Sequence, residues 1–269
     1  MNPKPVQVFT MSSDELSYLV RRFDINIVPG LAENSLISLS ESEQELASRI
    51  IENSLVARKY LTTSPDGTLV IESQLESVLK LMIRCAYVLV MTTSLTPGAP
   101  REVTICFISP NVVISEIFPR PHTHDIAVYM EPLDFAQDIA NMIPEPSGGS
   151  ASIDIWMPRP DWEKVIADAN KGEWYQSSLY PNVAVVQQLI AQSAQGIDLS
   201  LTSLLGDKLT TKILSVRWTN ETSLFATDDD ISDRYGEIRI RTMASGEIAN
   251  VLRAWLAPVQ PVKSIDPNG

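Results

Sequence analysis

Histidine and cysteine are scarce in this chain, and their scarcity limits the chemistry it can do. The 269 residues include two histidines and two cysteines. Two cysteines in a chain of this length do not make a disulfide framework. Cys85 and Cys106 lie in apolar stretches, so we expect both to be buried free thiols. With 44% hydrophobic residues, the chain can bury a substantial core and needs no disulfide bonds or metal ions to stabilise it.

Positive charge and long apolar runs are also in short supply. Lys and Arg number 21 against 33 Asp and Glu, which gives a net charge of −12 and disfavours a nucleic-acid partner. The longest apolar run, Val78 to Met91, is interrupted by Lys80 and is shorter than the roughly 20 residues of a membrane-spanning helix. Residues 1–5 show no targeting pattern. We therefore expect a cytoplasmic protein without membrane insertion.

Motifs for catalysis and cofactor binding are missing. The chain has no Gly-x-Ser-x-Gly elbow, and neither cysteine lies in an electropositive context. The segment Ser147 to Ser150 is rich in small residues but lacks the lysine and the glycine spacing of a phosphate-binding loop. We expect no enzyme activity, no catalytic residues and no cofactor.

Two segments carry metal-ligand residue types in incomplete patterns. His122 and His124, followed by Asp125, have a spacing that would place both rings on one face of a strand, but no further ligands accompany them. The prolines around His122 favour a turn, so we interpret both histidines as part of a solvated loop. The acidic run from Asp228 to Asp233 lacks the glycine and the glutamate of a calcium loop and is typical of a hairpin tip. We predict no metal site.

Hydrophobic periodicity and capping patterns predict an α+β fold. The first half is expected to hold helices after Ser12, from Ser40 to Leu61, from Ser73 to Ile83 and from Pro132 to Met142, a short strand at 68–71, and strands at 87–92, 102–109, 112–118 and 124–129. The second half is expected to hold a strand at 153–157, helices from Asp161 and from Asn182 to about Gln195, a short apolar segment at 199–205, strands at 210–219, 223–227 and 236–242, and a final helix at 245–256.

The order of these elements repeats along the chain. Residues 86–142 and 210–256 each run through strands and close on a helix. We therefore predict two similar halves, residues 1–143 and 151–269, in which antiparallel β-meanders are flanked by helices. The Pro-, Gly- and Ser-rich residues 144–150 are the expected linker, and the two halves are expected to form one compact unit.

The connection between the strands at 87–92 and 102–109 is the most distinctive candidate for binding. It is too long and too rich in proline for a tight hairpin turn, so it should protrude with apolar surface on a stiff segment. The candidate partner-binding residues are Leu95, Thr96, Pro97, Gly98, Ala99, Pro100 and Arg101.

A second candidate is a pair of arginines on a late strand. Arg239 and Arg241 alternate with isoleucines, so their guanidinium groups share a face and would suit a carboxylate-rich ligand. Glu237 shares that face, and cross-strand ion pairing is the alternative that we favour for both arginines.

Several segments carry a resemblance to a known family. They are Met11 to Leu16, Ala57 to Leu61 before Asp66-Gly67, Leu75 to Leu79 running into the strand Tyr87 to Met91, the strand pair around Pro97, and the closing helix Leu252 to Leu256. In this order the chain resembles the EspG family, the cytosolic chaperones of type VII (ESX) secretion systems.

That resemblance implies a function. Members of the family have two subdomains related by a quasi-two-fold axis and no catalytic residues, and they keep PE–PPE heterodimers soluble by covering an apolar tip of the PPE partner. By resemblance, the loop from Leu95 to Arg101 would contact a helical client, a PE–PPE-like or WxG-type heterodimer. Two other hypotheses stay open. One is a small-molecule-binding protein or enzyme with a cleft between the halves near Arg239 and Arg241, and the other is a homodimer formed through an edge strand.

Overall fold

The structure is a computed structural model that describes residues 5–23, 40–85, 87–95, 100–130, 132–145, 152–175, 179–180, 182–193, 195–205, 208–219, 223–228 and 236–256. Within these ranges the helices are α1 (Ser13–Arg21), α2 (Glu41–Ala57), α3 (Ser73–Arg84), α4 (Pro132–Asn141), α5 (Arg159–Lys171), α6 (Val183–Gln192) and α7 (Ser245–Leu256). The strands are β1 (Gln7–Ser12), β2 (Leu61–Thr63), β3 (Leu69–Ile71), β4 (Tyr87–Ser94), β5 (Glu102–Ser109), β6 (Val112–Arg120), β7 (Thr123–Met130), β8 (Asp154–Pro158), β9 (Gln195–Leu205), β10 (Lys208–Trp218), β11 (Ser223–Asp228) and β12 (Glu237–Thr242). The predicted α+β class is confirmed.

Ten of the described strands form one antiparallel sheet. Its order is β1-β7-β6-β5-β4-β9-β10-β11-β12-β8, and β2 pairs with β3 separately. Strands β4 and β9 meet at the centre, from Tyr87 opposite Ser203 to Ser94 opposite Gly196. Five strands precede residues 144–150 and five follow them, so a continuous sheet joins the two predicted halves. This order is the one that two-fold related halves would give, and the internal repeat itself stays a prediction.

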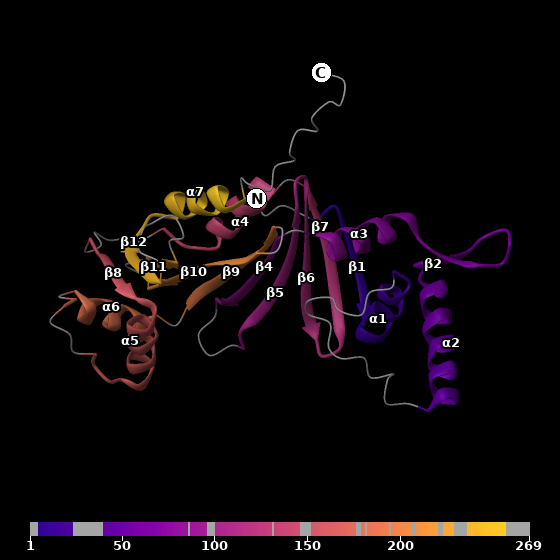
Figure 1. The fold of residues 1–269 in the computed structure, drawn as a ribbon, viewed down its shortest axis with the longest axis horizontal. Helices are drawn as coiled ribbons and strands as arrows, with labels where there is room; N and C mark the ends of the chain where they lie inside the picture. Colours follow the sequence, from indigo (N-terminus) through magenta and orange to yellow (C-terminus); the bar gives the residue numbers. More distant parts are fainter. Residues whose placement is uncertain are drawn as a thin grey trace, which may run out of the picture.

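Helices cover both faces of the sheet (Figure 1). Helices α4 and α7 pack on one face of the central strands, where Leu89, Leu199 and Leu252 belong to the same buried cluster. On the other face, α1, α2 and α3 cover the β1 end, and α5 and α6 cover the β8 end. The sheet therefore has one face with a continuous central core and an opposite face with two separate cores.

Local sequence signals explain several helix starts. Ser12 and Glu15 form a capping box at α1, in which the backbone N–H of Ser12 donates to the Glu15 carboxylate at 2.8 Å and that of Glu15 donates to the Ser12 hydroxyl at 3.1 Å. At α2 the backbone N–H of Ser40 donates to the carboxylate of Glu43 at 2.8 Å. Both helix starts predicted from these residues are confirmed.

Three strands, β1, β2 and β9, were not predicted as strands. Strand β1 has no predicted counterpart, although Phe9 and Met11 alternate with more exposed residues and are buried. Helix α2 ends at Ala57, before β2 begins at Leu61, because Lys59 takes a positive φ of 62° that ends the helix. Strand β9 begins at Gln195, where the predicted helix ended, and it runs 11 residues through the middle of the sheet. The predicted short segment is therefore a central strand.

Candidate binding site between the two halves of the sheet

A cavity of about 140 Å³ lies where the two halves of the sheet meet, on the face that carries α5 and α6. Its floor is formed by β4, β9 and β10, and its far wall by α5, α6 and β11. Polar residues line one side of it, among them Thr92, Ser94, Arg101, Asp198, Ser215 and Arg217. The other side is lined by the apolar residues Trp162, Ile166, Ile190 and Leu224, together with the polar residues Asn170 and Ser193. Both halves of the chain contribute to this site.

The strand period explains why polar side chains gather there. On β4, Leu89 and Met91 point into the core beneath α4 and α7, so Thr92 points to the opposite face. Ser215 is paired with Asp198 across β9 and β10, and paired residues share a face. The central strands therefore present a polar surface between the two helical layers of this face.

A hydrogen-bonded group fixes the polar side of the cavity. The Ser215 hydroxyl donates to Asp198 Oδ1 at 2.7 Å, and Arg217 Nη2 donates to Asp198 Oδ2 at 2.7 Å. Arg217 Nη1 also donates to the backbone oxygen of Val216 at 3.0 Å. Both oxygens of Asp198 are thus engaged, and the Arg217 guanidinium is held in one orientation.

Glycine at position 196 makes room for that arginine. Gly196 is paired with Arg217, and a Cβ at this position would lie 2.6 Å from Arg217 Cδ and 2.7 Å from Nη1. Such distances are shorter than van der Waals contact. The Arg217 side chain therefore lies across the backbone of β9 at the one residue that has no side chain to obstruct it.

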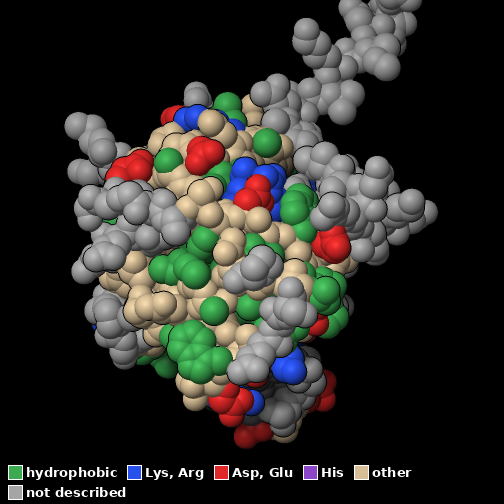
Figure 2. All heavy atoms as spheres, turned by 90° about the vertical axis from the view of Figure 1, so that its left-hand side faces the viewer, with side chains coloured by type: hydrophobic (Ala, Val, Ile, Leu, Met, Phe, Trp, Pro, Cys, Tyr) green, Lys and Arg blue, Asp and Glu red, His purple; other side chains and the backbone are tan. Residues whose placement is uncertain are grey.

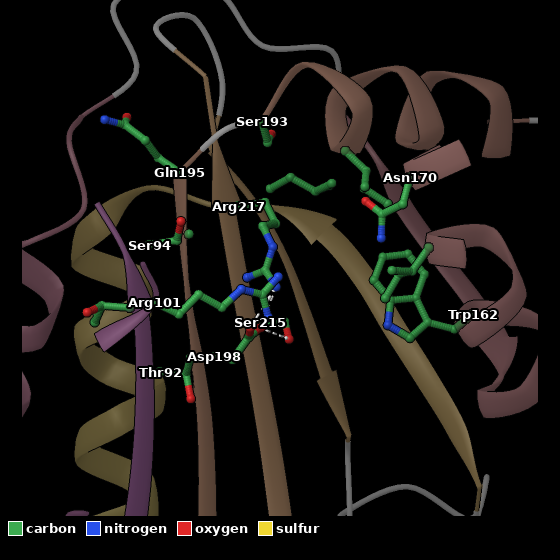
Figure 3. Close-up of a pocket in the computed structure, with 15 residues that line it drawn as sticks. Thr92, Ser94, Arg101, Trp162, Asn170, Ser193, Gln195, Asp198, Ser215 and Arg217 are labelled. Carbon is green, nitrogen blue, oxygen red and sulfur yellow. Dashed lines mark hydrogen bonds and ion pairs between the residues drawn. The ribbon is translucent and has the colours of Figure 1, made fainter. Parts of the chain in front are cut away.

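Arg101 reaches the same cavity from the other half of the chain. Figure 3 shows Arg101 and Arg217 both extending into the cavity beside Asp198 and Ser215, with Trp162 on the opposite side. Among the described residues, Arg101 has no acidic partner. One residue of the predicted partner-binding loop therefore belongs to the cavity.

The remainder of that predicted loop is only partly described. Leu95 is 40% exposed and Pro100 is exposed, whereas Thr96, Pro97, Gly98 and Ala99 lie outside the described residues. The backbone oxygen of Leu95 accepts a hydrogen bond from Gln195 Nε2 at 2.6 Å. The start of the loop is therefore fastened to the central strand β9.

The other predicted pair, Arg239 and Arg241, does not line the cavity. Ile238 and Ile240 are buried against α5 and α6, so the two arginines between and after them point to the opposite face of the sheet. Arg239 forms a two-pronged ion pair with Asp154 on β8, at 2.8 and 2.7 Å. The hydrogen bonds from Arg239, aided by the charge of Arg241, hold the pKa of Asp154 below its usual value. Cross-strand pairing of Arg239 is thus present, with Asp154 as the acid.

The two histidines lie in different environments. His122 is exposed in the turn between β6 and β7, as predicted, with a positive φ of 60°. The solvated-loop interpretation is wrong for His124, which is 2% exposed on β7. His124 Nδ1 lies 2.6 Å from Glu116 Oε1, and His124 Nε2 lies 2.8 Å from the Ser13 hydroxyl. The ring is buried because it faces the layer that holds α1, where Ser13 and Glu116 lie at its two nitrogens and Phe118 packs against it.

Contacts link Ser13 to His124 and His124 to Glu116, as a nucleophile is linked to a base and a base to an acid in a catalytic triad. This arrangement was not predicted from the sequence. Ser13 is the first residue of α1, and its backbone N–H donates to the oxygen of His122 at 3.0 Å. The contacts therefore hold the start of α1 against β7. None of the three residues lines the cavity between the halves.

The thiols and the acidic residues add no further cluster in the described part of the chain. Cys106 is buried as predicted and Cys85 is half-buried, and burial raises the pKa of both thiols, that of Cys85 to about 11. Over the described ranges, no group of three or more His, Cys, Asp or Glu side chains is placed to hold a metal ion. Most of the acidic run at 228–233 lies outside those ranges. No described helix is long and apolar enough to cross a membrane.

Taken together, one antiparallel sheet with helices on both faces makes an α+β fold, and this fold is shared with a solved EspG structure. One solved structure that shows this likeness is the type VII secretion system chaperone EspG5 of Mycobacterium tuberculosis, in complex with the PE25–PPE41 dimer. The TM-score is 0.62, the sequence identity is 12%, and the match covers 95% of this chain and 98% of the EspG5 chain. At this identity the likeness shows the fold alone. The sequence matches no protein-family model and no curated protein.

Proposed function

We propose that this protein is a cytoplasmic chaperone or adaptor that binds a helical substrate of a type VII secretion system. The observation that carries the proposal is the length of the structural likeness. It extends over 95% of the chain, and the similar protein is a chaperone solved with its PE–PPE partner. The client of this chain would be of the same kind, a PE–PPE-like or WxG-type heterodimer.

The rim of the cavity supplies the apolar contacts that such a client needs. Leu95 and Val103 are 40% and 39% exposed at the two ends of the connection between β4 and β5. Val103 is paired with Thr92, so it shares the face on which the cavity opens. Exposed apolar side chains that are bordered by polar residues mark sites of protein–protein interaction.

The helical layer beside the cavity offers a second apolar contact. Trp174 and Leu179, which lie between α5 and α6, are 61% and 78% exposed. Figure 2 shows the end of the molecule that these helices form, where hydrophobic side chains reach the surface among acidic and basic ones. We propose that a client lies over the β4–β5 connection and reaches this layer.

A capture experiment with one substitution at the loop tests the proposal. Tagged wild-type protein and Leu95→Asp would be incubated with lysate of the native cells, and the retained proteins identified by mass spectrometry. We expect the wild type to retain a helical secretion substrate and Leu95→Asp to lose most of it. The melting temperature should not change, because the Leu95 side chain is exposed.

Leu46→Asp is the matched control, because Leu46 is 61% exposed on α2, at the far end of the sheet. It should capture as much client as the wild type. Equal capture by Leu95→Asp and the wild type would overturn the role of the loop. Retention of no helical secretion substrate by any of the three proteins would overturn the proposed function itself.

A further inference from the structure

The size of the cavity limits what can enter it. At about 140 Å³ it is similar to engineered protein cavities of about 150 Å³ that admit one benzene molecule. A helix is about 10 Å across and does not fit such a space. The occupant must therefore be a small molecule about as large as one benzene ring, or one or two side chains of a partner protein.

The two sides of the cavity demand different chemistry from that occupant. Trp162 and Ile190, both 8% exposed, and Leu224, 2% exposed, give one side an apolar surface. The opposite side is formed by charged and hydroxyl groups. An occupant that satisfies both sides has an apolar body and a polar end.

The charge of the cavity indicates which polar group the occupant carries. Asp198 and Arg217 neutralise each other through their ion pair, and the second oxygen of Asp198 is occupied by the Ser215 hydroxyl. Arg101 adds a positive charge for which the described residues supply no acid. The cavity therefore carries an excess of one positive charge in a chain whose net charge is −12. The planar guanidinium forks of Arg101 and Arg217 match the geometry of a carboxylate.

We propose that this cavity is a binding site for a small apolar carboxylate. Its carboxylate lies at Arg101 and Arg217, and its apolar body lies against Trp162 and Ile190. Arg217 is held in place before binding by Asp198 and by the space above Gly196, so little side-chain entropy is lost on its part. The same chemistry is offered by a free acid or by adjacent glutamate and leucine side chains of a protein.

Calorimetric titration of the purified chain with benzoate tests this site without any client. Benzamide has the same shape and no charge, and it serves as the control ligand. We expect saturable binding of benzoate and none of benzamide. Arg101→Gln should weaken benzoate binding about tenfold or more, because it removes a charge-assisted contact. Arg49→Gln removes the same charge from the exposed outer part of α2 and should leave the affinity unchanged.

A second arm separates the two sources of the carboxylate. A capped Leu-Glu dipeptide is titrated in parallel with benzoate. Binding of benzoate that depends on Arg101 identifies a site for a free acid, and binding of the dipeptide alone, with the same dependence, identifies a site for a partner's side chains. If neither binds, or if Arg101→Gln and Arg49→Gln behave alike, the proposal is overturned. Failure of this proposal leaves the outcome of the capture experiment open, because no client takes part in the titrations.

Discussion

Gln195 Nε2 donates a hydrogen bond to the backbone oxygen of Leu95 across 2.6 Å. The oxygen of the same side chain accepts from Trp218 Nε1 at 2.8 Å. Trp218 is 4% exposed and belongs to the core beneath α4 and α7. Through one amide, a core residue of β10 is thus connected to the first residue of the candidate partner-binding loop.

Gln195→Ala should therefore destabilise the fold. The substitution leaves the indole N–H of a nearly buried tryptophan without its partner, which costs about 1–3 kcal/mol. Urea unfolding followed by fluorescence measures the loss. Gln192→Ala, at an exposed position on α6, is the control and should change stability by less than about 0.5 kcal/mol. Equal stabilities of the two variants would show that the amide does not support Trp218.

Much of the fold could be predicted from local patterns. The Ser-x-x-Glu sequences at Ser12 and Ser40 mark real helix starts, and the alternation of apolar residues identifies β4 to β7. Strand β9 shows the limit of prediction from local patterns. Ile197, Leu199 and Leu201 alternate as a strand requires, but they follow an apolar helix with no strong break between the two periods. Its partner β4 lies about 100 residues away in the chain, and no local signal specifies that pairing.

The candidate site was less predictable than the fold for the same reason. Asp198 and Arg217 are 19 residues apart, and they meet because the register of β9 and β10 places Ser215 opposite Asp198. Arg101 was predicted as a loop residue, but its position beside that pair depends on the central β4–β9 contact. Gly196 carried a usable signal, because an isolated glycine inside a strand often marks a close approach of another group.

Gly196→Ala tests that close approach. The new Cβ would lie 2.8 Å from the backbone oxygen of Val216, which cannot move as the Arg217 side chain can. We expect a loss of about 1–3 kcal/mol in the free energy of unfolding, together with weaker binding of any ligand held by Arg217. Gly246→Ala is the matched control, because nothing lies within 4 Å of a Cβ at this position in α7. That variant should be as stable as the wild type or about 0.5–1 kcal/mol more stable. A loss at Gly246 equal to that at Gly196 would contradict the steric explanation.

His124→Ala should be among the most damaging single substitutions. It leaves Glu116, which is 0% exposed, without the partner of its 2.6 Å contact and frees the start of α1 from β7. Leaving a buried polar group without its hydrogen bond costs about 1–3 kcal/mol, and the cavity left by the missing ring adds to this loss. Thermal unfolding followed by circular dichroism measures the effect. His122→Gly is the control, because glycine suits the positive φ of that exposed turn and should change stability by only about 0.5 kcal/mol. A variant at 124 as stable as the one at 122 would contradict the anchoring role.

Asp138→Asn should stabilise the protein, and only above acidic pH. Burial in the last turn of α4, with the nearby charge of Asp134, raises the pKa of Asp138. One of its oxygens, Oδ2, is buried without a hydrogen bond. Below the pKa of an unfolded aspartate, near 4, the group is protonated in both states and costs nothing. As the pH rises through the higher folded pKa, the folded state must ionise the group in an unfavourable site, so stability is lost. The asparagine variant escapes that loss. Its melting temperature should exceed that of the wild type at pH 7 and equal it near pH 3.

Asp134→Asn removes the same charge from an exposed position on the same helix and should give a smaller gain. A gain for Asp138→Asn that persists unchanged at pH 3 would show that the cause is not the ionisation of this carboxyl group.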